Sequence, residues 1–149
     1  MTSDLLSSTL YDNNSFYYKF KKDLLHAQQC VIIESPFITL KRMNELMPIL
    51  ISLRNKRIIV IVNTRNPDEH NDEYYQQAVE SIQQLQEIGV RVLYTAKLHR
   101  KIAIIDDAIL WEGSLNILSQ NDSCEIMRRS YSTELVHQIK RFTGCYQRI

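Results

Sequence analysis

The stretch RIIVIVNT (57–64) limits the possible folds of this chain more than any other segment. Its branched apolar residues follow one another without the polar alternation of a half-exposed strand, so both faces of this strand are expected to be covered. The segments before and after it, 40–56 and 72–88, space their apolar residues as amphipathic helices do. A sheet with helices packed on it accounts for all three segments.

The alternation of strand and helix begins earlier in the chain and ends near residue 95. Residues 14–28 have helical spacing, and QCVIIES (29–35) is typical of a short buried strand. Adjacent short strands follow at 90–95, 101–106, 108–113 and 124–129, and a helix closes the chain at 130–142. The sequence predicts one α/β domain over 14–149, a mixed β-sheet flanked by helices on both faces, after a flexible N-terminal segment at 1–13.

Three residues give local expectations about the helices. Pro48 lies inside the predicted helix at 40–56 and predicts a kink there or a helix that restarts. Gly89 is placed to end the following helix in the left-handed conformation. Ser132 is placed to cap the last helix.

Composition and charge narrow the classes of function. Lysine and arginine total 18 against 17 acidic residues, so the net charge of +1 gives no global case for nucleic acid or an anionic membrane. No segment approaches the roughly 18 apolar residues of a membrane span, and the N-terminus lacks the pattern of a signal peptide. Cys30, Cys124 and Cys145 do not suit a disulfide framework and are expected as small buried thiols. We therefore expect a soluble, cytoplasmic protein that does not bind membranes.

A candidate site lies at the two ends of a predicted hairpin, in LHRKIAIIDDAILWEGSLN (98–116). Because side chains alternate along a strand, His99 and Lys101 face the same side and can meet one ligand. Asp106 falls in the turn of the hairpin. The closing GSLN (113–116) offers a glycine that permits a tight turn or close approach, then a hydroxyl and an amide two residues apart.

This spacing resembles the signature motif of the phospholipase D superfamily. Every fixed position is present, in the order His99, Lys101, Asp106, Gly113, Ser114 and Asn116. The order of elements from about residue 14, including ESPFIT (34–39) and GVRVLYT (89–95), is similar to that of the small nuclease-like members. The resemblance implies a phospholipase D-like fold and a phosphodiesterase that needs neither metal nor cofactor.

The resemblance also implies roles for single residues. His99 is implied to attack a phosphodiester and carry a phosphohistidine, while a second histidine protonates the leaving oxygen. Lys101, Ser114 and Asn116 are implied to hold the nonbridging oxygens. Asp106 is implied to order the turn beside the site.

Family members use a further acidic residue, after the asparagine, to orient the histidine. Glu125 in NDSCEIMRR is the best match in this chain, and Asp122 is the alternative. Arg128 and Arg129 follow on the same predicted strand and are expected to project to opposite faces. One of them, together with Arg100 or Lys97, could track a phosphate backbone.

The motif occurs once in this sequence, whereas a complete site of this kind needs two histidines. His26, His70 and His137 are not followed by lysine at the required spacing. The resemblance therefore implies a homodimer in which His99 and its symmetry mate face each other. His70 stands among acidic loop residues that converge poorly on one ion, so no metal site is expected there.

Three functions stay open from the sequence. Single-copy small members of the family are mostly nucleases, which favours an endonuclease acting on DNA or RNA, alone or with a helicase or a restriction or defence partner. A lipid or small-alcohol phosphotransferase would need an apolar entry, of which the sequence gives no sign. A noncatalytic nucleic-acid-binding or dimerisation module would have no reason to keep the four polar residues His99, Lys101, Asn116 and Glu125.

Overall fold

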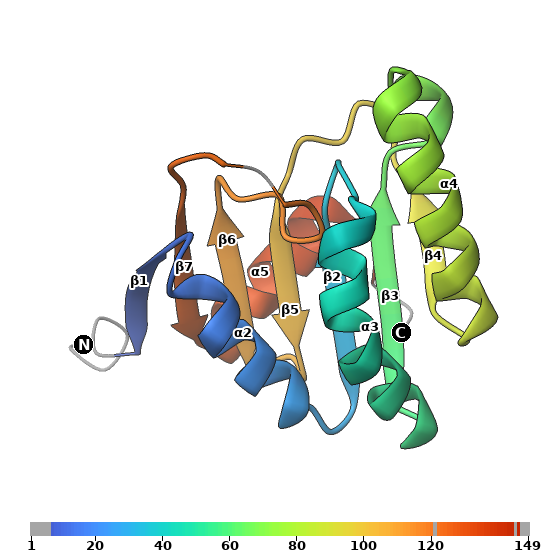
Figure 1. Ribbon diagram of the computed structural model, residues 1–149. Coiled ribbons are helices and arrows are strands. Elements are labelled where there is room, and N and C mark those ends of the chain that lie inside the picture. The colour runs from blue at the N-terminus through green and yellow to red at the C-terminus, as the bar shows by residue number, and fades with distance from the viewer. Residues whose placement is uncertain (1–6, 121, 145, 147–149) are drawn as a thin grey trace.

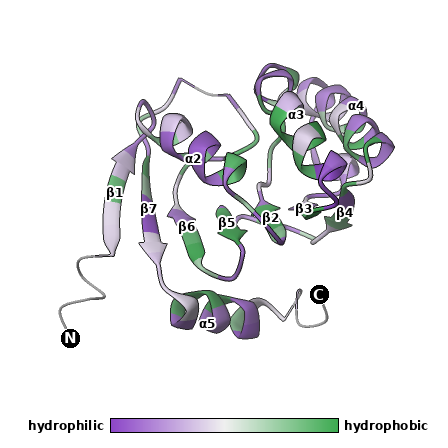
Figure 2. Ribbon diagram, turned by 90° about the horizontal axis from the view of Figure 1, so that it is seen from below, coloured by the Kyte–Doolittle hydropathy of each residue, from purple (hydrophilic) through white to green (hydrophobic). Residues whose placement is uncertain are grey.

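The computed structural model describes residues 7–120, 122–144 and 146. In this part a seven-stranded sheet with the order β1-β7-β6-β5-β2-β3-β4 has α2, α3 and α4 on one face and α5 on the other (Figures 1 and 2). The mixed sheet flanked on both faces is thus confirmed. The strands are β1 (Ser8–Asp12), β2 (Cys30–Glu34), β3 (Ile59–Thr64), β4 (Arg91–Tyr94), β5 (Ile102–Ile105), β6 (Ile109–Gly113) and β7 (Ile126–Tyr131). The helices are α2 (Phe16–Leu25), α3 (Leu40–Asn55), the 3-10 helix η1 (Pro67–Glu69), α4 (Asp72–Glu87) and α5 (Thr133–Thr143).

The sheet has a parallel half and an antiparallel half. Strands β2, β3 and β4 run parallel and are joined by α3 and α4. Both crossovers step in the same direction across the sheet, and both helices lie on the same face, as a constant handedness of crossover requires. The strands β5, β6, β7 and β1 add to the other side of β2 in antiparallel pairs.

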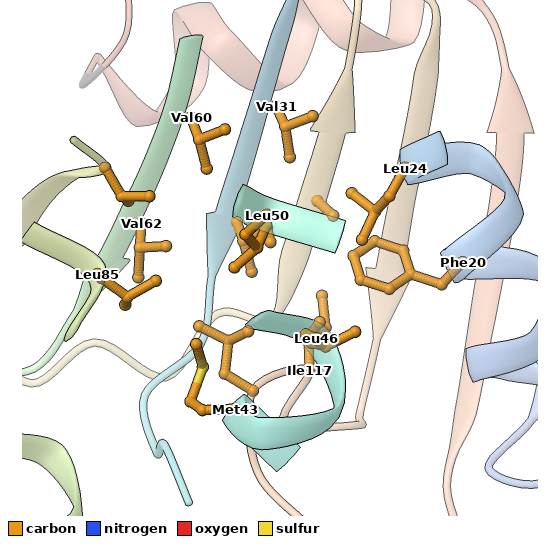
Figure 3. Close-up of a cluster of buried hydrophobic side chains, with 14 of the residues drawn as sticks. Phe20, Leu24, Val31, Met43, Leu46, Leu50, Val60, Val62, Leu85 and Ile117 are labelled. Carbon is orange, nitrogen blue, oxygen red and sulfur yellow. The ribbon is translucent and has the colours of Figure 1, made fainter. Parts of the chain in front are cut away.

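The predicted burial of RIIVIVNT on both faces is confirmed for residues 60–64, whereas Arg57 and Ile59 near the start of the run are exposed. Val60 and Val62 of β3 pack into the cluster under α2, α3 and α4, which Figure 3 shows around Leu50 and Leu85. Ile61, between them, belongs to the second cluster, which includes Val136 of α5. Because β-strand side chains alternate, cover on both faces accounts for the unbroken apolar run Val60, Ile61 and Val62.

The expected flexible segment at 1–13 is wrong for residues 8–12. These residues form the edge strand β1, paired with β7 from Ser8↔Ser130 to Asp12↔Ile126. The Tyr11 ring packs 5.0 Å from the Trp111 ring, which ties the strand to the core. An edge strand half open to solvent has little apolar pattern of its own, and STLYD was therefore not recognised. Residues 1–6 of the expected segment lie outside the described residues.

The expectations for Gly89 and Ser132 are confirmed, and the expectation for Pro48 is not. Gly89 has a φ of +90°, in the left-handed region, and the Ser132 hydroxyl accepts from the Leu135 amide at 3.2 Å. The helix α3, however, does not restart at Pro48 but continues to Asn55. Pro48 and Asn44, whose carbonyl the proline cannot satisfy, are both exposed, so water can replace the missing donor.

The cysteines follow the prediction only in part. Cys30 is half-buried, and burial raises the pKa of its thiol. Cys124 is exposed, contrary to the prediction, because it lies in the polar connection before β7. Cys145 lies outside the described residues. None of the helices in the described ranges has the length and apolar character needed to span a bilayer.

Candidate active site

The hairpin β5–β6 brings both ends of the predicted motif to one end of the sheet. Ile102 pairs with Glu112, so the residues that precede β5 lie beside those that follow β6. The Gly113 amide donates to the Lys101 carbonyl at 3.4 Å across this junction. The carboxyl ends of the parallel strands β2 and β3 lie at this same end of the sheet (Figure 1).

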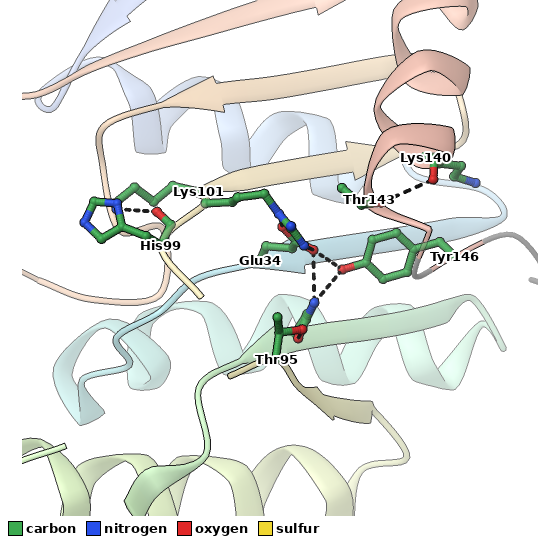
Figure 4. A network of polar contacts seen from close by, with 9 residues as sticks. Glu34, Thr95, His99, Lys101, Lys140, Thr143 and Tyr146 are labelled. Carbon is green, nitrogen blue, oxygen red and sulfur yellow. Dashed lines mark hydrogen bonds and ion pairs between the residues drawn. The ribbon is translucent and has the colours of Figure 1, made fainter. Parts of the chain in front are cut away.

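Lys101 lies directly against His99. The lysine is only 8% exposed, and its Nζ donates to the His99 carbonyl at 2.6 Å and lies 3.3 Å from the His99 Nδ1 (Figure 4). Burial lowers the pKa of Lys101, and the positive charge of Arg65 lowers it further. His99 itself is exposed. An anion that reaches the imidazole therefore meets a fixed cation beside it.

Arg65 supports the same segment and was not anticipated from the sequence. Its Nε donates to the Leu98 carbonyl at 2.6 Å, and its guanidinium lies 5.2 Å from the centre of the Phe37 ring. Arg65 directly follows the buried strand β3. A basic residue at the carboxyl end of a buried parallel strand was the signal that could have identified it.

Glu125 enters the site from the connection before β7. The hydroxyls of Ser114 and Ser123 hydrogen-bond its carboxylate and hold the pKa of Glu125 below its usual range. The positive charge of Lys101 acts in the same direction. Ser114 is fixed in turn by β7, because its Oγ accepts from the Ile126 amide at 3.1 Å. The structure thus brings Glu125, Ser114 and Lys101 together.

Asn116 lies in the loop between β6 and β7, and its side-chain oxygen makes no hydrogen bond to the described residues. This oxygen, Oδ1, is buried. The loop is held on the connection from β2 to α3, where Leu118 donates to the Ser35 Oγ at 3.1 Å and accepts from the Thr39 amide at 3.0 Å. A buried polar atom left unpaired in a fixed loop is available to a ligand.

Gly113 is required by close packing of two strands. A Cβ atom at this position would lie 2.2 Å from the Ile126 carbonyl oxygen and 2.9 Å from the Met127 Cα. The sequence suggested either a tight turn or a close approach at this glycine. The structure shows a close approach, and the approaching group is the β7 backbone.

A buried carboxylate at the end of β2 anchors the segment that carries His99. Arg100 donates from Nε and Nη2 to the two oxygens of Glu34, at 2.8 and 2.9 Å. Asn63 donates to the same carboxylate at 3.0 Å, and the Tyr146 hydroxyl also donates to it (Figure 4). Glu34 was not anticipated from the sequence, although an acidic residue at the end of the apolar run CVII was a usable signal.

Asp106 orders a turn, but the turn is not beside the site as expected. The four residues of β5 separate Asp106 from Lys101 and place it at the opposite end of the sheet. Its carboxylate accepts from the amides of Gln28, Gln29 and Cys30, at 2.8, 2.8 and 3.0 Å. Asp106 therefore joins the β5–β6 turn to the start of β2.

Asp106→Ala is expected to destabilise the fold by about 2–4 kcal/mol more than Asp107→Ala, because it leaves three amides without their charged acceptor. Both residues have positive φ, so the backbone strain of alanine is the same in both variants. Asp107 makes only a surface ion pair with Lys140, which contributes about 1 kcal/mol or less. Urea unfolding of the two variants measures the difference, and equal stabilities would contradict this role for Asp106.

Arg128, Arg129 and His70, the next candidates from the sequence, have structural partners. Arg129 pairs with the buried Asp23 at 2.8 Å, and Arg128 donates to the Ser8 Oγ at 2.7 Å. The His70 ring packs 5.0 Å from the Phe37 ring. Among residues 7–120, 122–144 and 146, no group of three or more His, Cys, Asp or Glu side chains is placed to hold a metal ion.

Comparison with known proteins agrees with this geometry. A family model described as "Cardiolipin synthase, PLD-like domain" matches residues 20–144. NucT from Helicobacter pylori has the same fold, with a TM-score of 0.73 and 19% identity over 91% of each chain. Nuc, a phospholipase D family member from Salmonella typhimurium, gives a TM-score of 0.74 at 11% identity over 91% of this chain and 90% of its own.

A third solved structure shares the fold over part of its length. TrmBL2, an archaeal chromatin protein with a novel mode of DNA binding, gives a TM-score of 0.63 at 13% identity over 94% of this chain and 51% of its own. No curated protein matches this chain significantly. Because the family model covers most of the chain and the fold agrees with that of Nuc, this protein belongs to the phospholipase D superfamily.

Proposed function

We propose that this protein is a cytoplasmic, metal-independent phosphodiesterase, an endonuclease for DNA or RNA that works through a phosphohistidine. The observation that carries the proposal is the contact between His99 and Lys101, 3.3 Å from Nδ1 to Nζ, at the end of the β5–β6 hairpin that also carries Ser114. An exposed imidazole beside a fixed cation suits attack on an anionic phosphodiester.

The reaction has two displacement steps. In the first, a ring nitrogen of His99 forms a bond to phosphorus while the bond to the leaving oxygen breaks, and that oxygen takes a proton from a second histidine. In the second, water attacks phosphorus, gives its proton to the second histidine, and the nitrogen–phosphorus bond breaks. Lys101, Ser114 and the amide group of Asn116 stabilise the charge on the nonbridging oxygens, and Glu125 stabilises the histidine cation.

The second histidine is proposed to come from a second copy of this chain. The motif occurs once in the sequence, and a twofold axis near His99 would place two copies of the imidazole at one phosphodiester. Static light scattering at micromolar concentration is expected to give the mass of a dimer.

Nucleic acid is proposed as the substrate on two grounds. The single motif is typical of the small nuclease-like members, and TrmBL2, which shares the fold, binds DNA. The family model's description names a lipid synthase, so a lipid or small-alcohol phosphotransferase is the alternative enzyme. A nucleic-acid-binding module without catalysis is the alternative that TrmBL2 favours.

The first test compares four substrates in excess EDTA: single-stranded DNA, duplex DNA, RNA and phosphatidylcholine. Cleavage of a nucleic acid that survives EDTA supports the proposed mechanism, because Lys101 and the amide donors then supply the charge stabilisation without a divalent ion. Cleavage of phosphatidylcholine alone would favour the lipid enzyme. Binding of nucleic acid by the dimer without turnover would favour the noncatalytic module.

A further inference from the structure

A cavity of about 730 Å³ opens beside the proposed catalytic residues. Its lining residues come from the β6–β7 loop and from the starts of α2, α3 and α4. These segments lie at the end of the sheet where β2, β3 and β6 end (Figure 1). Asn116 and Ser123 line it, and Ser123 hydrogen-bonds Glu125. Asn116, which the proposed mechanism places at the scissile phosphate, is therefore also part of the cavity wall.

The lining of the cavity is polar but electrically balanced. Lys41 and Arg42 from α3 are offset by Glu73 from α4 and Asp122 from the β6–β7 loop. Most other lining residues carry amides or hydroxyls. Such a wall of neutral donors and acceptors suits the edge of a nucleobase or a sugar, whereas an acyl chain would require an apolar wall.

Two polar atoms from this lining are buried without a partner. Within the described residues, Asn116 Oδ1 lacks a donor and Arg42 Nε lacks an acceptor. Arg42 is held in place by Glu45, at 2.6 Å, and by the Tyr17 ring, whose centre lies 3.5 Å from its guanidinium carbon. Each unpaired buried group costs about 1–3 kcal/mol. A nucleobase carries both kinds of partner, an N–H for the Asn116 oxygen and a carbonyl for the Arg42 Nε.

An aromatic ring completes the cavity. Tyr74 lines it, and its ring is supported by the rings of Phe37 at 5.0 Å and His70 at 6.2 Å. A ring fixed in this way offers a stacking surface for a base, and stacking of this kind contributes about 1–3 kcal/mol per base.

We propose that this cavity receives an unpaired nucleotide next to the scissile phosphate, so that the substrate is single-stranded nucleic acid. The inference rests on the proposed function, since the scissile phosphate is placed at His99. A base inside a duplex could enter only after leaving its stack and its partner, which costs a few kcal/mol. The cavity therefore selects unpaired strands over duplexes.

The test measures binding with the His99→Ala variant, so that no substrate is consumed. Fluorescence anisotropy compares a labelled single-stranded DNA, an RNA of the same sequence and the corresponding duplex. We expect at least one single strand to bind about tenfold more tightly than the duplex, and Tyr74→Ala or Lys41→Ala, each added to His99→Ala, to weaken that binding about tenfold. Tyr75→Ala and Lys56→Ala, added in the same way, are the matched controls and should bind like His99→Ala alone, since neither residue lines the cavity.

Equal binding of single strands and duplex would overturn the inference. Equal affinities for the Tyr74→Ala and Tyr75→Ala variants, together with equal affinities for the two lysine variants, would also overturn it. Lys41 is exposed, so its replacement leaves the fold intact even if that of Tyr74 does not. If the cavity variants lose binding but the wild-type protein hydrolyses no phosphodiester, the proposed catalysis fails and the binding site stands. If hydrolysis depends on His99 and the cavity variants bind normally, only this inference fails.

Discussion

His99→Ala is expected to reduce phosphodiester hydrolysis by about 10⁴-fold or more in kcat, because the nucleophile that forms the covalent bond is lost. The assay is hydrolysis of a labelled single-stranded oligonucleotide and of bis(p-nitrophenyl) phosphate in EDTA. His137→Ala is the matched control, since His137 is an exposed residue of α5 on the other face of the sheet. It should keep the wild-type rate. A His99→Ala protein that retains most of its activity would exclude the phosphohistidine mechanism.

Mixed dimers test whether two copies of His99 serve one phosphodiester. Wild-type protein and His99→Ala protein are unfolded together in equal amounts and refolded, so that subunits pair at random. About half of the wild-type subunits then have an inactive partner. If both histidines are needed, the activity falls to about half that of the same wild-type protein refolded alone. Activity that does not change would mean that each subunit works by itself.

Local pattern was enough to predict most of the elements and the composition of the candidate site. The apolar run at 57–64 required cover on both faces, and Ile61 and Val62 indeed face different clusters. The spacing of the motif predicted which side chains lie close together, because the second strand of a hairpin ends beside the start of the first. His99, Lys101 and Ser114 therefore lie where antiparallel pairing places them.

The parts that the sequence did not reveal depend on contacts between distant residues. Glu34 and Arg100 are 66 positions apart, and nothing local to either shows that they pair. Strand β1 was missed because its order comes from pairing with β7, about 120 positions later. The position of Asp106, in contrast, could have been predicted from the sequence. Four strand residues at about 3.3 Å each separate Asp106 from Lys101.

Glu34→Ala is expected to lower the free energy of unfolding by about 3–5 kcal/mol. The carboxylate is fully buried and accepts hydrogen bonds from Arg100, Asn63 and Tyr146. Its removal takes the charged acceptor away from these hydrogen bonds in a region of low dielectric. Urea unfolding measures the loss, and Glu45→Ala, which breaks the more exposed pair with Arg42, should cost about 1 kcal/mol or less.

A double variant separates the ion pair from the rest of the network. Once Glu34→Ala has removed the carboxylate, Arg100→Ala removes a cation that no longer has its buried partner. The two changes together should therefore cost about 1–3 kcal/mol less than the sum of the single changes. Additive costs would mean that Arg100 is held by solvent rather than by Glu34. Because Arg100 is the neighbour of His99 in the chain, a strong coupling would also identify the ion pair as the anchor that sets the position of the nucleophile.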